Sequence, residues 1–307
     1  MLELHELEVF LIAAETENFS EAGRILQISQ PAVSGHIQNL EQRLNVRLFE
    51  RTGRNIKLNE VGQAFVPVVR NLLKEARRAE EFVASRQGAV VGQLTIGCST
   101  ASGKYVLPRL MARFMEQHPD VRLTCHIRPR GDALDQLCNG EIDLAISSLR
   151  LPRRPVEYRH FSDDYLVLIV PLDHPWARLD SPLMPEDLVA YPLVLREASS
   201  GTTITLNREL AKHEMSVEML QTHLILGNTE SIVQAVIEGI GPAFVSRVSA
   251  QVALRDKRVA EAPVAHLELV QRLYMARSTA FHESEVQTRF WEFTFAPENE
   301  ALRQLLT

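Results

Sequence analysis

The stretch SQPAVSGHIQNLEQRL, residues 29–44, decides how the N-terminal part of the chain folds. Its apolar residues recur at the spacing of one helix face; they are Val33, Ile37, Leu40 and Leu44. The opposite face carries small and amide side chains, whereas a solvated helix face normally carries Lys and Glu. We therefore expect a helix that buries one side and leaves the other side bare enough for a partner to approach closely.

Two shorter helices are expected before this stretch. Apolar residues at helical spacing predict a first helix from about residue 4, and Asn18-Phe19 should break it. Ser20 is the expected N-cap of a second helix over residues 21–26. After a tight turn, Ser29 caps the third helix, and Pro31 falls in its first turn. Two short helices joined in this way are typical of a helix-turn-helix, whose second helix enters the major groove of DNA.

A bare helix face suits contact with bases and phosphates. Gln38 has the geometry to bind an adenine edge through two hydrogen bonds, and Ser34 is a candidate for a base or phosphate contact. The N-terminus of the helix favours phosphate. The candidate DNA-binding residues on this helix are Ser29, Gln30, Pro31, Ala32, Ser34, Gly35 and Gln38. An ordinary capped helix in a helical bundle remains the alternative.

A basic hairpin is expected directly after this helix. Residues 48–51 and 55–58 flank Thr52-Gly53-Arg54, a pattern that predicts two strands and a turn. Arg51 and Arg54 are the further candidate DNA-binding residues, because a projecting wing can reach the backbone or minor groove. The local basic run is Arg43, Arg47, Arg51, Arg54 and Lys57, with Glu50 opposing it. For each of these residues, a solvated position on a charged hairpin remains the alternative to DNA contact.

A long helix is expected over residues 59–88, with Asn59 as its N-cap. Its single apolar stripe consists of Val61, Phe65, Val68, Leu72, Ala76, Ala79 and Val83. Because charged residues occupy the rest of its surface, the stripe predicts pairing with a second copy of the chain. Pro67 should bend the helix or delay its start. Packing against the same chain is the alternative.

The run FSEAGRILQISQPAVSGHIQNLEQRLNVRLFERTGR, residues 19–54, resembles the signature of LysR-type transcriptional regulators. The resemblance extends over the whole chain, more loosely after Gly88. It implies a winged helix-turn-helix that binds double-stranded DNA, a tetramer built as a dimer of dimers, a partly palindromic operator, and RNA polymerase as a partner. Many members carry Arg, Lys or Gln at the position of Gly35, so this chain lacks one base-reading side chain.

After an expected hinge at residues 88–93, strands and helices alternate. Strands at 94–98, 121–127 and 142–146 with helices at 105–117 and 131–139 predict a parallel sheet. A second set follows, with strands at 166–170, 193–195, 220–226, 243–246 and 267–276 and helices at 202–214, 230–238 and 283–295. The resemblance implies a periplasmic-binding-protein-like effector domain with two α/β subdomains. It divides the chain into 1–58, 59–88, 92–162 with 267–307, and 163–266.

Polar loops follow several of these strands. In open α/β sheets, ligands bind beyond the carboxyl ends of strands, where helix N-termini offer free N–H groups. The candidate effector-binding residues are Ser99, Thr100, Ser102, Ser147, Ser148, Ser200, Gly201, Thr202 and Thr229. Each alone fits a plain N-cap, but together they favour a pocket for a small anion. For Arg128, Arg130 and Arg196, a role at the surface is the favoured interpretation.

The composition of the chain limits the classes of protein to which it can belong. The chain has 307 residues, 45% hydrophobic content and a net charge of −6, which acts only weakly against nucleic acid as a partner. No apolar run is long enough to cross a membrane, and the acidic N-terminus MLELHELEVF does not resemble a secretory signal. The three cysteines form no CxxC pair. We therefore expect a cytoplasmic protein without a disulfide framework, metal site or cofactor.

Two other classes of function are weighed. A solute-binding α/β protein with N-terminal helices used for assembly is the alternative to a regulator. An enzyme would use Cys98 or Ser99, but the sequence lacks GxSxG, P-loop and GxGxxG motifs. Cys98 is also a candidate thiol sensor, although a buried apolar cysteine is the favoured interpretation.

Overall fold

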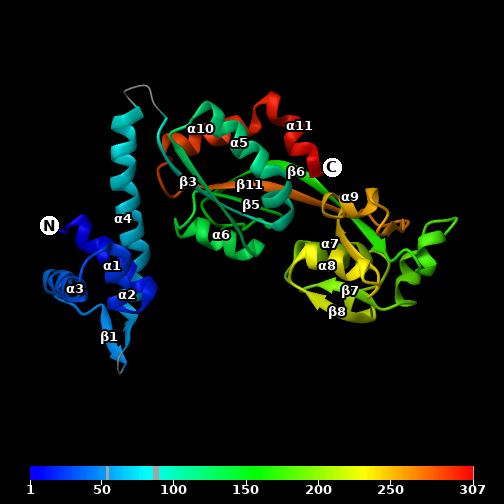
Figure 1. Ribbon diagram of the computed structural model, residues 1–307, viewed down its shortest axis with the longest axis horizontal. Coiled ribbons are helices and arrows are strands. Elements are labelled where there is room, and N and C mark those ends of the chain that lie inside the picture. Colours follow the sequence, from blue (N-terminus) through cyan, green and yellow to red (C-terminus); the bar gives the residue numbers. More distant parts are fainter. Residues whose placement is uncertain (53–54, 86–89, 307) are drawn as a thin grey trace. The chain divides into compact units, whose positions relative to one another are not determined.

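Figure 1 shows the computed structural model of the chain. It describes residues 1–52, 55–85 and 90–306. These residues divide into two compact units: the N-terminal helices with their hairpin, and the α/β segment that follows. No helix in the described part of the chain has the length and apolar character needed to span a bilayer. The expected turn at Gly53-Arg54 and the start of the expected hinge at Gly88-Ala89 lie outside the described residues.

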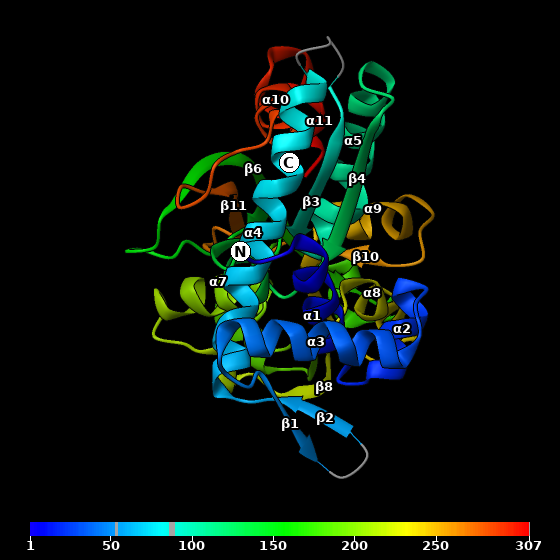
Figure 2. The same cartoon turned by 90° about the vertical axis from the view of Figure 1, so that its left-hand side faces the viewer.

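The N-terminal unit is a helix-turn-helix followed by a hairpin and a long helix. Its elements are α1 (Leu4–Thr16), α2 (Phe19–Leu26), α3 (Gln30–Leu44), β1 (Phe49–Thr52), β2 (Asn55–Leu58) and α4 (Glu60–Ser85). The strands β1 and β2 pair antiparallel, which confirms the expected hairpin. Figure 2 shows this hairpin projecting on the side of the unit where α3 lies.

Side-chain caps set the helix boundaries. Ser20 is not the cap of α2, because Asn18 Oδ1 accepts hydrogen bonds from the backbone N–H groups of Ser20 at 2.9 Å and Glu21 at 3.2 Å. The sequence offers two cap-forming side chains close together, and the one that comes first in the chain reaches both N–H groups. Ser29 caps α3, as expected, by accepting from Ala32 N at 3.3 Å. Asn59 caps α4 by accepting from Gly62 N at 2.8 Å.

One face of α3 lies in the core of the N-terminal unit. Val33, Ile37 and Leu40 are buried against residues of α1 and α2, including Phe10 and Ala22. This confirms the orientation expected from the apolar spacing. Glu41, on the same helix, accepts hydrogen bonds at Oε1 from Leu48 N at 2.7 Å and from Phe49 N, at the start of β1, at 3.2 Å. The hairpin is therefore tied to the end of α3.

The second unit is built on a mixed sheet. Its strands are β3 (Gly92–Cys98), β4 (Val121–Ile127), β5 (Leu144–Ser147), β6 (Val156–Val170), β7 (Leu193–Arg196), β8 (Thr222–Leu226), β9 (Ala243–Ser246), β10 (Ala260–Glu261) and β11 (Val270–Ser278). Within the described residues, these nine strands form one sheet. Eight of them follow the order β4-β3-β5-β11-β6-β9-β7-β8, and β10 pairs with β6. The parallel pairing of β3 with β4 and β5 confirms the expected first α/β set.

Helices cover this sheet. They are α5 (Leu107–Gln117), α6 (Arg130–Cys138), α7 (Gly201–Ala211), α8 (Thr229–Ile237), α9 (Arg247–Arg255), α10 (Glu285–Phe295) and α11 (Glu300–Arg303). The sequence did not predict α9, which follows β9 directly. It also placed a loop at 99–103, where the chain is helical from Thr100 and forms a π-helical turn, η1, over Ser102–Val106. The backbone N–H of Leu107 closes this turn on Ser102 O.

Two strands connect the two sets of packed residues in this unit. β6 and β11 pair antiparallel along their length (Figure 1). The first part of β6 packs with residues of β3, β5, α5 and α10, and its last part packs with residues of β7, α7 and β9. Sequence reasoning recognised only residues 166–170 of β6, because polar residues interrupt the apolar pattern before Leu166.

Candidate functional site

The outward face of α3 is open, as a nucleic-acid interface requires. Ser29, Gln30, Pro31 and Gln38 are exposed, and Ala32, Ser34 and Gly35 are partly exposed. A Cβ added at Gly35 would find no atom within 4 Å. The structure thus places all seven predicted residues of this stretch outside the core, and no side chain of the described residues fills the space in front of Gly35.

A shallow groove continues from this face toward the hairpin. It has a volume of about 450 Å³ and is lined by Gln38, Glu41, Gln42, Asn45, Val46 and Arg47. Gln38 and Gln42 bring amide groups, which both donate and accept hydrogen bonds. The contribution of Asn45 was missed from the sequence. Its left-handed backbone at the end of α3, with φ of 52°, turns the chain beside the groove.

The basic residues of this region have different positions. Arg43 is exposed, but its guanidinium is already paired within the chain. Its guanidinium pairs with Glu3 at 3.0 Å and with the buried Glu6 at 3.2 Å, because α1 passes beside the end of α3. Arg47 and Lys57 are exposed. Arg51 lies in β1, but the structure does not describe its side chain. Arg54 lies outside the described residues.

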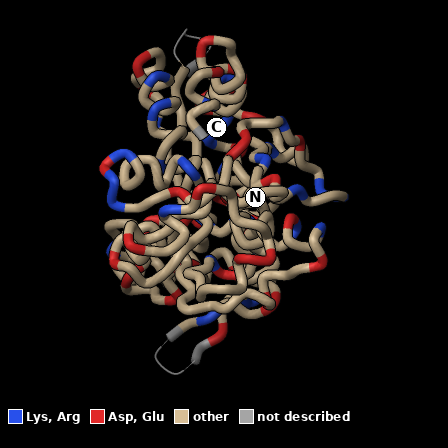
Figure 3. Tube along the Cα trace, turned by 90° about the vertical axis from the view of Figure 1, so that its right-hand side faces the viewer, with Lys and Arg blue, Asp and Glu red and all other residues tan. Residues whose placement is uncertain are grey.

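Charge is distributed in small groups over the described chain. Figure 3 shows acidic and basic residues interspersed along the trace. The net charge of −6 therefore does not exclude local basic groups. A local basic group near α3 can neutralise phosphates even though the chain is acidic as a whole.

A second candidate site is a cavity in the α/β unit. It has a volume of about 230 Å³ and lies where β3, β5, β7 and β8 end. The antiparallel strands β6 and β11 also contribute to its wall. Seven of the nine predicted effector residues line it, namely Ser99, Thr100, Ser148, Ser200, Gly201, Thr202 and Thr229. Ligands of open α/β sheets bind in such a position.

The remaining two predicted residues do not line this cavity. Ser102 is fully buried, and its hydroxyl lies 3.1 Å from Ser99 Oγ. Ser147 is also fully buried; its Oγ donates to Arg130 O at 3.3 Å and accepts from Leu149 N at 3.0 Å. Both hydroxyls therefore form hydrogen bonds within the fold, and the structure does not bring them to the surface of this cavity.

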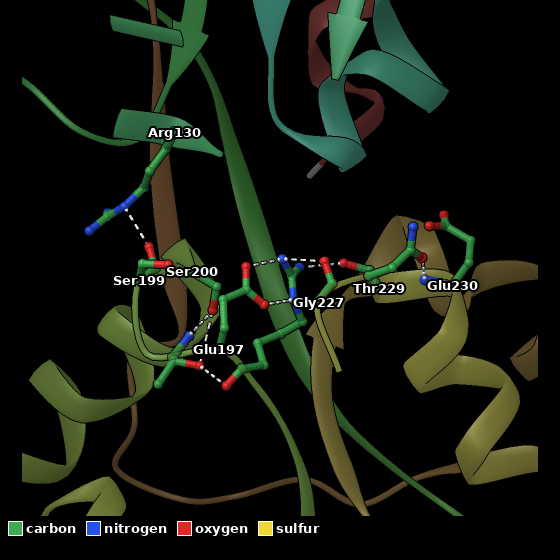
Figure 4. Close-up of polar contacts among 10 residues, drawn as sticks. Arg130, Glu197, Ser199, Ser200, Gly227, Thr229 and Glu230 are labelled. Carbon is green, nitrogen blue, oxygen red and sulfur yellow. Dashed lines mark hydrogen bonds and ion pairs between the residues drawn. The ribbon is translucent and has the colours of Figure 1, made fainter. Parts of the chain in front are cut away.

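The N-termini of two helices border the cavity. At the start of α7, Ser200 Oγ accepts from Thr203 N at 3.1 Å, and at the start of α8, Asn228 Oδ1 accepts from Glu230 N at 2.8 Å (Figure 4). The first N–H groups of a helix have no acceptor within the helix. Both termini therefore add partial positive charge to the cavity, and they favour an anion.

Arg196 is part of the cavity wall and not of the surface, contrary to the sequence interpretation. Its side chain is 13% exposed and forms two short contacts to Glu197, at 2.7 and 2.9 Å. It also donates to Thr229 Oγ1 at 2.9 Å and to Gly227 O at 3.2 Å (Figure 4). Burial opposes ionisation of Glu197, but its hydrogen bonds from Arg196 prevail and lower its pKa. This pair holds the segments before α7 and α8 together.

Arg128 and Arg130 also line the cavity; Arg128 is exposed and Arg130 is partly buried. Arg130 Nε donates to Ser199 O at 3.0 Å (Figure 4). Its Nη1 lies 3.4 Å from Ser148 Oγ. Burial lowers the pKa of Arg130. The contact links the start of α6 to the segment before α7. Lys104 of η1 forms a second link to Glu230 of α8, at 2.9 Å.

The cavity residues that were missed from the sequence include three on strands, Asp164, Ser246 and Gln271. Asp164 of β6 is 2% exposed and accepts a hydrogen bond from Ser246 Oγ of β9. Burial raises the pKa of Asp164 to about 7, although the hydrogen bond from Ser246 acts in the opposite direction. Gln271 of β11 donates to Ser148 Oγ at 3.3 Å. Two consecutive acidic residues, Asp163 and Asp164, precede the apolar run, and only the length of β6 shows which of them faces the cavity.

Cys98 lies beside this region without lining the cavity. It is fully buried, and its Sγ lies 3.4 Å from Cys125 Sγ. The hydrogen bond with Cys125 and burial raise the pKa of Cys98. A thiolate is the reactive form of cysteine, so this environment favours the interpretation of Cys98 as a core residue over that of a nucleophile or sensor.

Two protein families match the chain in succession. The family described as "Bacterial regulatory helix-turn-helix protein, lysR family" matches residues 4–63. The family described as "LysR substrate binding domain" matches residues 87–296, which is more than half of the chain. The second match covers the α/β unit with its cavity, and the first covers α1 to the start of α4.

Individual relatives agree with these matches. The chain is 30% identical over 295 residues to "HTH-type transcriptional activator CmpR" of Synechocystis sp., covering 95% of each chain. It is 32% identical over 249 residues to "Probable RuBisCO transcriptional regulator" of Nostoc sp., covering 79% of this chain and 73% of that one. These matches leave no ground for the alternative of a solute-binding protein with assembly helices.

Solved structures share the fold over nearly the whole chain. A full-length variant of OxyR from Pseudomonas aeruginosa superposes with a TM-score of 0.71 at 21% identity, covering 99% of this chain and 95% of that chain. Full-length CbnR in complex with its target DNA superposes with a TM-score of 0.69 at 21% identity, covering 95% of this chain and 99% of that chain. The chain therefore belongs to the LysR family of transcriptional regulators, which are not enzymes, and combines a DNA-binding helix-turn-helix with an effector-binding domain.

Proposed function

We propose that this regulator reads a specific DNA sequence with the outer face of α3 and responds to a small anion bound in the cavity. The single observation that carries the effector proposal is the make-up of the cavity. Hydroxyl groups, Arg128 and Arg130 and the N-termini of α7 and α8 converge on one space of about 230 Å³. Such donors recognise carboxylate, phosphate or sulfate groups.

We also propose the domain boundaries expected from the sequence: 1–58 for the winged helix-turn-helix, 59–88 for the linker helix, 92–162 with 267–307 for subdomain I, and 163–266 for subdomain II. The cavity then lies between the subdomains. An effector can shift a regulator only between states that it binds unequally. An anion contacting Arg130 on one side and Thr202 on the other would favour the closed arrangement, and this closure is the proposed signal.

Assembly is proposed to use α4. Its exposed apolar residues in the described chain include Val61, Val68, Leu72 and Val83, whereas Phe65 of the predicted stripe packs near Phe10 in the N-terminal core. Exposed apolar residues along one helix favour pairing with a second copy. We propose a dimer of dimers that binds a partly palindromic operator, with RNA polymerase as a further partner. The site of action is the cytoplasm, where bacterial DNA lies.

The named relatives suggest where to search for the effector. The Nostoc and Synechocystis relatives are described as a RuBisCO regulator and the activator CmpR. A role in carbon assimilation is therefore the first proposal to examine for this chain. Small carboxylates and phosphates suit both that role and the charge of the cavity.

Replacing Gln38 with alanine should weaken specific DNA binding by about tenfold or more, because a lost bidentate base contact costs roughly 1–3 kcal/mol. Non-specific binding should be unchanged. Arg47→Ala is the contrast: loss of a phosphate contact should weaken both kinds of binding and reduce the salt slope by about one. DNA selected from a random pool, with gel retardation at several salt concentrations, measures both. Equal losses of specific and non-specific binding for Gln38→Ala would remove Gln38 from base reading.

Ser99→Ala and Thr202→Ala should each weaken anion binding by about tenfold while DNA binding persists, because each removes a hydroxyl from the cavity. At a probe concentration of about 100 times the Kd, stabilisation should fall from about 2.7 to about 1.4 kcal/mol. Thermal unfolding with sulfate, small carboxylates and phosphates measures this change. Ser181→Ala, an exposed serine outside the cavity, is the control. Unchanged stabilisation in both cavity variants would contradict the site.

A further inference from the structure

The cavity contains one acid that the proposed anion site does not explain. Asp164 lines the cavity and is 2% exposed. Among the described residues, the hydroxyl of Ser246 is its one side-chain hydrogen-bond donor, and that bond is made to Oδ1. A carboxylate normally accepts several hydrogen bonds when it is buried. The second oxygen of Asp164 is therefore left for a group that enters the cavity.

The charges around Asp164 decide what that group is. Arg128 and Arg130 line the same cavity. Arg196 also lines it, but its guanidinium is already held by both carboxylate oxygens of Glu197. Together with two helix N-termini, the unmatched positive charge exceeds the negative charge, so the cavity favours an anion rather than a cation.

Among the residues that the structure describes, the neighbouring strands β9 and β11 bring no charged side chain to the cavity. β9 presents Ser246 and β11 presents Gln271, both of which line the cavity and neither of which titrates. Alternate residues of a strand point to opposite faces. Consistent with this, Asp163 pairs with His160 at 2.8 Å, and Arg247 pairs with Glu261. Arg272 is exposed beside Gln271 and lies outside this cavity.

An anion next to an ionised Asp164 would meet a buried negative charge. A neutral acid removes this repulsion and gains a donor, because a protonated carboxyl donates one hydrogen bond. Burial already raises the pKa of Asp164 to about 7 in the empty cavity. The proton therefore costs little free energy near neutral pH, and an anion in contact with it would raise the pKa further.

We propose that Asp164 is a specificity-determining residue that binds the anionic effector as a neutral acid, so that the effector and one proton enter the cavity together. The proton comes from solvent and stays on Asp164, which donates it in a hydrogen bond to an effector oxygen. This inference rests on the proposed anion site. It makes the regulator respond more strongly to its effector as the pH falls.

The test measures anion affinity against pH with the full chain. Sulfate and oxalate serve as probes, because their charge does not change between about pH 6 and pH 8. Linkage of one proton to a group with a pKa of about 7 predicts affinity about tenfold higher at pH 6 than at pH 8. Isothermal titration calorimetry in buffers of different ionisation enthalpy should also detect uptake of the proton.

Three variants separate Asp164 from its surroundings. Asp164→Asn keeps the shape and cannot titrate, so its affinity should be independent of pH over this range. Asp163→Asn makes the same substitution one residue away, on the opposite face of β6, and should retain the tenfold dependence. Ser246→Ala removes the donor that favours the ionised form, so the midpoint of the pH dependence should move to higher pH. Circular dichroism verifies the fold of each.

The outcomes distinguish this inference from the proposed function. Binding that does not depend on pH in the wild-type chain would overturn the role of Asp164 and leave the anion site standing. Affinity for sulfate or oxalate that rises with pH in the wild-type chain would show that the anion does not bind together with a proton, which also overturns it. If neither probe bound to any of the four chains, the anion site itself would be contradicted, and the inference would fall with it.

Discussion

Replacing Gly23 with alanine is expected to disrupt the turn between α2 and α3 and to abolish DNA binding. A Cβ at this position would lie 2.7 Å from the carbonyl oxygen of Ile28 and 3.4 Å from the backbone nitrogen of Gln30. Both are backbone atoms, so relief requires a shift of the start of α3. Overpacking of this kind costs roughly 1–3 kcal/mol, and here it also displaces the helix that carries Gln38.

Gly35→Ala is the matched control for Gly23→Ala. The substitution is the same and lies in the same unit, but a Cβ at Gly35 would meet no atom within 4 Å. Alanine in a helix interior is favoured over glycine by roughly 0.5–1 kcal/mol, so this variant should be slightly more stable. Thermal unfolding and gel retardation measure both variants. Equal stability of the two variants would show that the close backbone contact at Gly23 does not destabilise the alanine variant.

Asp164→Asn is expected to become more stable, relative to the wild-type chain, as the pH rises from about 4 to 8. In the unfolded chain Asp164 ionises near its ordinary value of 3.8, whereas in the folded chain its pKa is about 7. Between these values the folded chain holds a proton that the unfolded chain has released. The wild type therefore has its full stability below about pH 4 and loses it as the pH rises to about 7.

The size of this change follows from the pKa difference. A shift of this size amounts to as much as about 4 kcal/mol, and asparagine, which does not titrate, avoids the loss. The measurement is calorimetric unfolding of both chains, without effector, at about pH 4, 6 and 8. Asp163→Asn is the control, because its side chain is partly exposed and pairs with His160. A stability difference that stays constant over this range of pH would refute the buried-acid assignment.

Local patterns determined most of what could be predicted from the sequence. The burial of Val33, Ile37 and Leu40 follows from their spacing, and the caps at Ser29 and Asn59 follow from their side chains. The strands at 121–127 and 243–246 were predicted at the bounds that the structure gives. In these cases the local pattern of residues is enough to predict the element or the buried face, although not its partner.

Contacts over long sequence distances explain what could not be predicted. Arg43 is paired because Glu6, far back in the chain, lies buried beside it. Arg196 is a wall residue because the loop before Thr229 closes over it. Asp164 lines the cavity only because β6 is longer than its apolar run and β9 brings Ser246 to it. Spacing along the chain carries no information about these partners.

The central claim is that the outer face of α3 lies in a groove of DNA, and photo-crosslinking tests it most directly. Gly35→Cys places a thiol where the structure leaves open space, and a photoreactive aryl azide can be attached to it. With DNA selected by the full chain, illumination should join Gly35→Cys to bases within each half-site. Crosslinks confined to another protein segment, with none to DNA, would contradict the account.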